Sequence, residues 1–141
     1  MRSVLTLLAV LPTLAHSQQP EGVIARCGAS SGHSYFFETE PDQAAPVWEA
    51  DRIAQGKIVL VRLGDEWDIQ FDDYVGSYSY RQDGAVVMPL LESGNLLTVG
   101  VFNNDYVDVY TFDLASRTVG WSSNKHGPFL PKVSAFAAAC D

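Results

Sequence analysis

Basic residues are scarce in this chain. Nine lysines and arginines stand against 17 aspartates and glutamates among 141 residues, which gives a formal net charge of −8. Nucleic acids and anionic membrane surfaces attract proteins with a surplus of positive charge. The composition therefore predicts that neither is a partner of this protein.

Histidine and cysteine are scarce as well. Outside the amino-terminal segment the only histidines are His33 and His126, too far apart for zinc-ligand spacing. The two cysteines, Cys27 and Cys140, form no Cys-x-x-Cys redox motif, and no glycine-rich phosphate loop ends in lysine. We therefore predict no metal site and no cofactor.

Long apolar runs are missing except at the amino terminus. Val4–Leu11 is apolar apart from one threonine, but a membrane span needs about 20 residues. Arg2 precedes this run and the small-residue pattern Ala15-His16-Ser17 follows it, which is typical of a signal peptide. We predict a cleaved signal peptide over residues 1–17, export to the periplasm or the exterior, and no membrane anchor after cleavage. The alternative is a buried amino-terminal helix.

The remaining residues, 18–141, have the length of one domain, and we take it as a monomer by default. They carry eight basic and 17 acidic residues, a net charge of −9. In an exported protein an even cysteine count predicts a disulfide, here between Cys27 and Cys140. A bridge closing so long a loop stabilises by about 4–5 kcal/mol in the chain-entropy description. It also requires the first and last strands to lie close together.

One hairpin is predicted in detail. Apolar and polar residues alternate strictly in Trp67–Asp72, as in a half-buried strand. The apolar segment Lys57–Leu63 precedes it, and Gly64-Asp65 is suited to a two-residue turn. The turn sets the register, in which Leu63 faces Glu66, Arg62 faces Trp67, Leu60 faces Ile69, Ile58 faces Phe71 and Lys57 faces Asp72.

The other expected strands are short and separated by turn residues. They are Val23–Cys27, Tyr35–Glu38, Ser77–Arg81, Ala85–Leu90, Leu96–Phe102, Tyr106–Phe112, Arg117–Ser123 and Lys132–Cys140. Asp83-Gly84 predicts a second hairpin, and Pro89 predicts a strand that ends there or lies at an edge. Pro46–Gln55 fits either a short helix or a further strand.

These patterns predict an all-β domain without internal repeats. We expect a small antiparallel up-and-down barrel or a two-sheet sandwich of about 8–10 short strands, closed by one disulfide. One short helix is an alternative for the segment Pro46–Gln55.

A serine motif offers one catalytic hypothesis. Gly28-Ala29-Ser30-Ser31-Gly32 matches the Gly-x-Ser-x-Gly nucleophile elbow, and His126 follows in the required order. That elbow joins a strand to a helix, whereas His33–Phe37 resembles a strand. We therefore interpret the motif as a turn and predict no catalytic residue.

Acidic side chains gather between residues 65 and 73: Asp65, Glu66, Asp68, Asp72 and Asp73. They lack the central glycine and the closing glutamate of a calcium loop. We interpret them as a solvated acidic face, with a loose extracellular calcium site as the alternative.

A buried charge is predicted on the hairpin of residues 96–112. Its apolar face carries Tyr106, Asp108 and Tyr110. An inward carboxylate requires a partner such as Arg62, Arg81 or a tyrosine hydroxyl. The functional hypothesis is a pocket that binds a small polar or aromatic ligand and is lined by Arg62, Tyr106, Asp108 and Tyr110. The alternatives are a structural Arg–Asp pair and a face directed to solvent.

Three classes of function follow from these patterns. The first is a non-enzymatic exported module that binds a small ligand or a partner. We favour this class because the one catalytic motif in the sequence is interpreted as a turn. The second is an interaction or inhibitor protein that engages a partner through the acidic face. The third is a small secreted hydrolase using Ser30 or a carboxylate pair.

Overall fold

The computed structural model describes residues 21–37, 46–72, 76–127 and 131–141, and within these ranges the chain is built from strands and turns without a helix. None of the described segments is therefore a helix capable of crossing a bilayer. The predicted signal peptide, residues 1–17, lies outside the described residues and stays a prediction.

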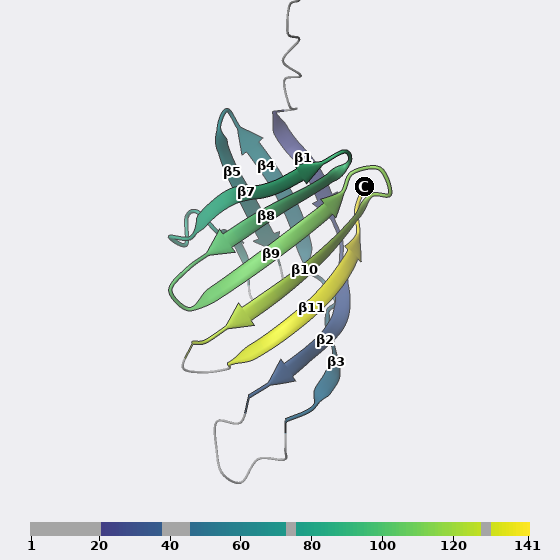
Figure 1. The fold of residues 1–141 in the computed structure, drawn as a ribbon, viewed down its shortest axis with the longest axis vertical. Helices are drawn as coiled ribbons and strands as arrows, with labels where there is room; N and C mark the ends of the chain where they lie inside the picture. The colour runs from purple at the N-terminus through teal and green to yellow at the C-terminus, as the bar shows by residue number, and fades with distance from the viewer. Residues whose placement is uncertain (1–20, 38–45, 73–75, 128–130) are drawn as a thin grey trace, which may run out of the picture.

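Two antiparallel sheets make up the described part of the chain (Figure 1). The four-stranded sheet has the order β1-β4-β5-β6, with β1 (Gly22–Cys27), β4 (Lys57–Leu63), β5 (Glu66–Asp72) and β6 (Ser77–Ser79). The seven-stranded sheet has the order β3-β2-β11-β10-β9-β8-β7, with β2 (Ser30–Phe36), β3 (Trp48–Ile53), β7 (Val86–Ser93), β8 (Leu96–Phe102), β9 (Tyr106–Asp113), β10 (Thr118–Lys125) and β11 (Lys132–Ala139).

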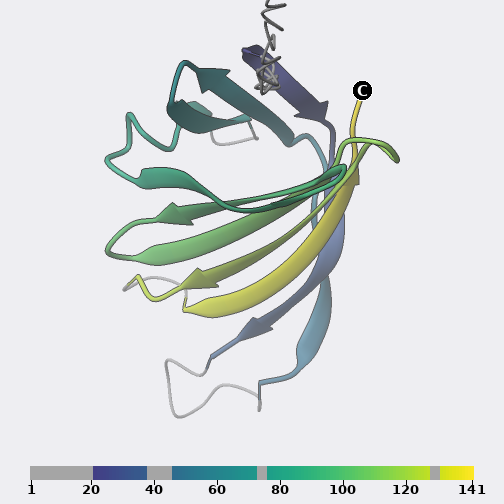
Figure 2. The ribbon, with the colours of Figure 1, turned by 45° about the horizontal axis from the view of Figure 1, so that its top comes forward.

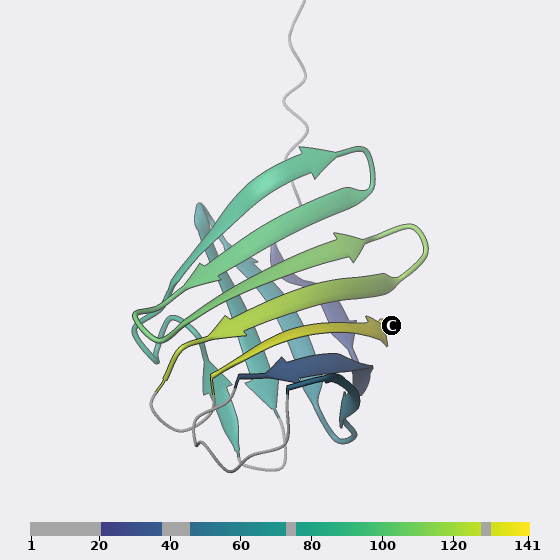
Figure 3. The same ribbon diagram turned by 60° about the horizontal axis from the view of Figure 1, so that its bottom comes forward.

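The sheets meet at one corner and diverge from it, with their strands crossing steeply (Figures 2 and 3). At this corner the chain leaves β1 and enters β2, passing from one sheet to the other. Cys27 is bonded there to Cys140, their Cα atoms 3.8 Å apart. Gly28 N donates to Ala139 O at 2.9 Å, and Asp141 N donates to Arg26 O at 2.7 Å. The predicted disulfide and the sandwich are confirmed; the barrel alternative is wrong, because the sheets do not close.

The predicted hairpin forms as β4 and β5, with every predicted pair in place from Leu63 opposite Glu66 to Lys57 opposite Asp72. Gly64 adopts a φ of +62°, which glycine tolerates best and which allows the two-residue turn. Turn chemistry and alternation agree here, so local sequence is enough to specify the pairing.

The core lies between the two sheets. Ile58, Leu60 and Ile69 come from the four-stranded sheet and are fully buried. The seven-stranded sheet contributes Val99 and a stack of aromatic rings, in which Trp121 lies 5.2 Å from Tyr110 and 4.7 Å from Phe136. The face predicted to be apolar on the hairpin of β8 and β9 is the inward one, as the burial of Leu97, Val99, Val101, Asp108, Tyr110 and Phe112 confirms.

The second predicted hairpin is wrong. Residues 80–84 do form a turn, with Gly84 at a φ of +86°. However, β6 pairs with β5 and β7 pairs with β8, so this turn carries the chain between the sheets. At this turn the Tyr80 side chain is buried between the sheets and donates to Asp108 of β9 in the second sheet, a contact outside the predicted hairpin. The β7 strand lies at a sheet edge and shifts register between Pro89 and Leu91, as the proline predicted.

Of the two alternatives for Pro46–Gln55, the strand is confirmed: Trp48–Ile53 form the edge strand β3. Strand β3 pairs along β2, and the Trp48 ring packs 5.7 Å from Tyr35. Asp51 accepts hydrogen bonds from Ser34 and Lys132. These contacts with neighbouring strands outweigh the helix-like spacing of the apolar residues.

Candidate functional site

Asp108 is a carboxylate buried between the sheets. Strand β9 directs it inward, and its residue is 2 % exposed. Tyr80 Oη donates to Asp108 Oδ2 at 2.6 Å, and the hydroxyls of Tyr80 and Tyr110 are 2.7 Å apart. Because the single proton of Tyr80 goes to the carboxylate, Tyr110 is the donor in the second bond. The result is a chain of hydrogen bonds that ends at Asp108.

The second oxygen of Asp108 has no hydrogen bond. Ser123 stands directly opposite Asp108 on β10, yet Asp108 Oδ1 and Ser123 Oγ both lack a partner in the described part of the chain. Buried polar atoms are nearly always paired, so two orphan atoms side by side require an explanation. A ligand or a water molecule that reaches Oδ1 would supply one.

Burial dominates the electrostatics of this group. It raises the pKa of Asp108, while Ser123, Tyr80, Lys125 and Lys132 lower it and offset part of the effect. Ser123 is thus near enough to act on the carboxyl although the pair falls outside hydrogen-bond geometry. Burial also raises the pKa of Tyr80 and of Tyr110 well above 10, so both remain neutral donors.

A cavity of about 230 Å³ opens beside Asp108, and we call it the tyrosine pocket. Its lining consists of Tyr78, Tyr80, Asp83, Tyr106, Asp108 and Lys125. Tyr106 Oη donates to Asp83 Oδ2 at 3.2 Å, and the Tyr106 ring lies 5.7 Å from that of Tyr80. Burial raises the pKa of Tyr106 to about 12. Three aromatic rings, two carboxylates and one lysine thus surround a small space.

The structure brings together part of the predicted set. Tyr106 and Asp108 line the tyrosine pocket, and Tyr110 lies behind it in the core. Arg62 does not reach Asp108: its guanidinium lies over the Trp67 ring, 5.3 Å from the centroid, and Nε donates to Gly64 O at 2.8 Å. Of the partners predicted for Asp108, the described structure shows a tyrosine hydroxyl, that of Tyr80, while Arg62 is held next to the hairpin turn.

Sequence reasoning missed the other lining residues, Tyr78, Tyr80, Asp83 and Lys125. The segment from Tyr78 to Asp83 contains two tyrosines and an acid, a signal that was visible. The pattern predicts a hairpin there, and that hairpin gives no reason to place the Tyr80 side chain against Asp108 of the second sheet.

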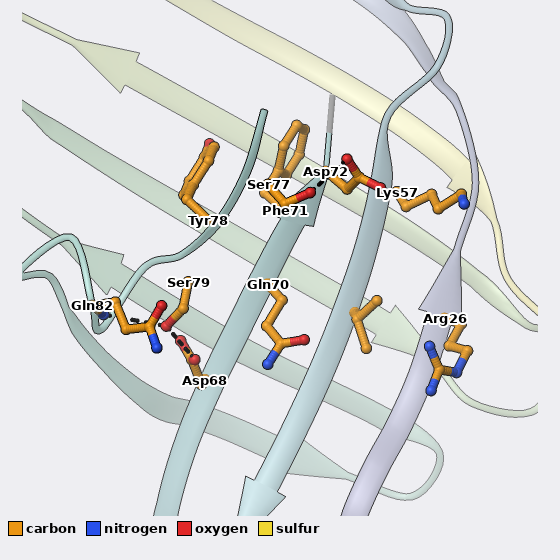
Figure 4. A pocket seen from close by; sticks show the side chains of 11 residues that line it. Arg26, Lys57, Asp68, Gln70, Phe71, Asp72, Ser77, Tyr78, Ser79 and Gln82 are labelled. Carbon is orange, nitrogen blue, oxygen red and sulfur yellow. Dashed lines mark hydrogen bonds between the residues drawn. The ribbon is translucent and has the colours of Figure 1, made fainter. Parts of the chain in front are cut away.

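A second cavity, of about 460 Å³, lies on the outer face of the four-stranded sheet, and we call it the outer groove (Figure 4). Arg26, Val59, Gln70 and Ser79 form one row across its four strands. The residues that line it are Arg26, Lys57, Val59, Asp68, Gln70, Phe71, Asp72, Ser77, Tyr78, Ser79 and Gln82. Tyr78 borders both the outer groove and the tyrosine pocket.

Two predicted acidic residues, Asp68 and Asp72, belong to the outer groove. Ser79 Oγ donates to Asp68 Oδ2 at 2.5 Å, and Ser77 Oγ donates to Asp72 Oδ1 at 2.9 Å. Among the described residues, no three His, Cys, Asp or Glu side chains gather as a metal site. Asp73, also part of the predicted acidic face, lies outside the described residues.

Ser30 has no catalytic partner within reach. It is buried, and it accepts a hydrogen bond from Trp121 Nε1 at 3.3 Å. His33 lies on the exposed, opposite face of β2. His126 follows the far end of β10, about 20 Å along the strands from Ser30. The serine version of the hydrolase hypothesis therefore lacks its general base.

Comparison with protein families, with curated proteins and with solved structures finds no match to this chain. Its function is therefore argued from the geometry of the tyrosine pocket and the outer groove.

Proposed function

We propose that this protein is an exported, non-enzymatic binding module that takes a small primary ammonium ligand in the tyrosine pocket. The observation that carries the proposal is Asp108, a buried carboxylate that lines the cavity and whose Oδ1 has no hydrogen-bond partner within the described structure. The disulfide is consistent with an oxidising compartment such as the periplasm or the exterior.

The chemistry of the lining favours an ammonium group. An N–H donor would complete the hydrogen bonding of Asp108, and a second carboxylate, Asp83, stands in the same wall. Tyrosine faces attract cations, most strongly where water is excluded. Lys125 is the one cation in the lining, and it forms no ion pair with either carboxylate within the described structure. With both carboxylates ionised, two negative charges face one positive charge, so the lining is negative overall.

The same lining supports binding over catalysis. Tyr80 and Tyr110 stay protonated at neutral pH, so they donate hydrogen bonds and do not act as bases. No histidine lines the tyrosine pocket. An interaction protein with a uniform acidic face is less favoured, because Asp68 and Asp72 share the outer groove with Arg26 and Lys57.

Three small probes of the mature protein test this proposal. We expect n-butylammonium to bind more tightly than tetramethylammonium, which is a cation without an N–H donor. We also expect it to bind more tightly than 1-butanol, which has a donor without a charge. Calorimetric titration gives the affinities, and the amide NMR signals of Tyr106 and Asp108 report the location.

Asp108→Asn is the matching variant, and we expect it to weaken n-butylammonium binding by about tenfold or more, since it removes a charge-assisted hydrogen bond. Asp113→Asn is the control, because Asp113 lies on the same strand but outside the tyrosine pocket, with its carboxylate bonded to the turn at residues 115 and 116. Equal affinities for the three probes, or unchanged binding by Asp108→Asn, would overturn the proposal.

A further inference from the structure

The outer groove has opposite charges at its two sides. Arg26 on β1 and Lys57 on β4 are diagonal neighbours that face outward. Asp68 and Asp72 lie on β5, on either side of Gln70. Strands β1 and β5 are two strand spacings apart, so about 10 Å separates Arg26 from the acidic strand, whereas Lys57 on β4 is one strand spacing from it.

The charges in the outer groove do not neutralise one another. Lys57 stands directly opposite Asp72, a position from which a cross-strand ion pair normally forms. Nevertheless, Lys57 and Arg26 form no ion pair in the described part of the chain. Figure 4 shows the Lys57 side chain extending away from Asp72, towards the side of Arg26.

The serines of β6 keep the carboxylates where they are. Ser77 binds Asp72 and Ser79 binds Asp68. Gln82 N donates to Ser79 Oγ at 3.2 Å, which fixes the hydroxyl that holds Asp68. Two cations are therefore available on one side, and oriented carboxylate oxygens on the other, with the Gln70 amide between them. The exposed ring of Tyr78 closes one end.

We propose that the outer groove is a second ligand site, which binds a short zwitterion such as a free tripeptide. Its carboxylate pairs with Arg26 and Lys57, and its ammonium group pairs with Asp68. An extended tripeptide spans about 10 Å, which matches the separation across the sheet. The amide of Gln70 is placed to pair with a peptide group in the middle.

Triglycine is the probe, and its two blocked forms are the controls. N-acetyl-triglycine lacks the ammonium charge and triglycinamide lacks the carboxylate. We expect triglycine to shift the amide NMR signals of Arg26, Lys57, Gln70 and Ser79. Each blocked form should bind about tenfold more weakly or worse, because it loses one charge-assisted contact.

Matched variants test the two sides of the outer groove separately. Arg26→Gln should weaken triglycine binding, whereas Arg52→Gln, at an exposed arginine of β3, should not. Asp68→Asn should weaken it, whereas Asp65→Asn, in the exposed turn, should not. Circular dichroism checks that each variant is folded.

Three results would overturn the proposal: no shifts at millimolar triglycine, equal binding of a blocked form, or shifts confined to the tyrosine pocket. Binding of n-butylammonium to the tyrosine pocket is independent of all three, so the two proposals can fail separately.

Discussion

The carboxylate of Asp108 lowers the stability of the core, whereas the binding that we propose for the tyrosine pocket requires it. Burying a carboxylate is unfavourable unless its charge and its lone pairs are satisfied. Asp108 receives one hydrogen bond, from Tyr80, and leaves Oδ1 unpaired beside Ser123. An amide side chain would satisfy the same contacts without a charge, which is why we propose a ligand for this carboxylate.

Asp108→Asn should therefore stabilise the protein at pH 7 while it removes ammonium binding. An asparagine oxygen still accepts from Tyr80, and its NH2 group can donate to Ser123 Oγ, which now lacks a partner. We expect the free energy of unfolding to rise by about 1 kcal/mol. Urea unfolding followed by tryptophan fluorescence measures the change. A destabilised variant would show instead that Asp108 is a structural residue.

The pH dependence of this effect has a defined sign. Because burial raises the pKa of Asp108 above its ordinary value of 3.8, the native state binds more protons than the unfolded chain between those two values. The stability of the native protein therefore falls as pH rises through this window. The advantage of Asp108→Asn should be smaller at pH 3 than at pH 7. An advantage that is the same at both pH values would contradict the raised pKa.

Among the elements, strands β2 and β3 are attached to the seven-stranded sheet by a buried polar network. Ser34 Oγ bonds to Ser134 Oγ and to Asp51 Oδ2, both at 2.6 Å, and Lys132 Nζ lies 3.2 Å from the same carboxylate. Burial opposes ionisation of Asp51, but these hydrogen bonds and the Lys132 charge lower its pKa overall. The network links β3, β2 and β11 in register.

Close packing of β2 on β11 depends on Gly32. A Cβ at this position would overlap the carbonyl oxygen of Ala135 and the backbone of Phe136. We expect Gly32→Ala to destabilise the protein by about 2 kcal/mol or more, since a backbone must move to make room. Gly28→Ala is the control: a Cβ at Gly28 meets nothing within 4 Å. Thermal unfolding of both variants tests this expectation, since Gly32→Ala should melt at a lower temperature than Gly28→Ala. Two equal melting temperatures would contradict the role of Gly32 in the packing of β2 on β11.

The sequence predicts those elements whose pairing is decided locally. The β4–β5 hairpin was predictable pair by pair, because a two-residue turn and strict alternation both specify its register. Asp83-Gly84 correctly indicates a turn, but a turn does not determine which sheet the next strand joins. That choice depends on where Tyr80 is buried, which is a property of the whole sandwich.

The residues of the candidate site also fall into two groups, those that the pattern of one strand predicts and those that depend on how distant strands pair. Alternation along β9 was sufficient to place Tyr106 and Asp108 on one face. The position of Arg62 along β4, next to the turn, excluded it from the tyrosine pocket, and no pattern within one strand reveals that distance. The outer groove escaped prediction because its row from Arg26 to Ser79 crosses four strands. Only the β4–β5 pairing in this row is local. The β1–β4 pairing joins residues distant in sequence, and β6 belongs to a segment whose pattern predicts a different hairpin.

At the scale of the whole molecule, the corner at Cys27 and Cys140 joins two sheets that otherwise touch mainly through side chains. The isolated bridge between these residues and the backbone bonds of Gly28 and Asp141 surround the disulfide. Elsewhere the sheets are held by the aromatic stack around Trp121 and by the Tyr80–Asp108 bond. The disulfide is therefore the one covalent restraint on the angle between the sheets in the described structure.

Removing this disulfide should destabilise the domain strongly. The bond closes a loop with a sequence separation of 113 residues, so the Cys27→Ala/Cys140→Ala double variant should lose about 5 kcal/mol in the chain-entropy description. That loss is comparable with the entire stability of many domains of this size, about 5–15 kcal/mol. Urea unfolding with and without a reductant measures it, and the double variant itself should not respond to the reductant.

If the loss is instead below about 1 kcal/mol, the unfolded chain already keeps its two ends together. In that case the backbone pairing of β1 with the end of β11 would hold the corner, and the disulfide would serve to resist proteolysis there.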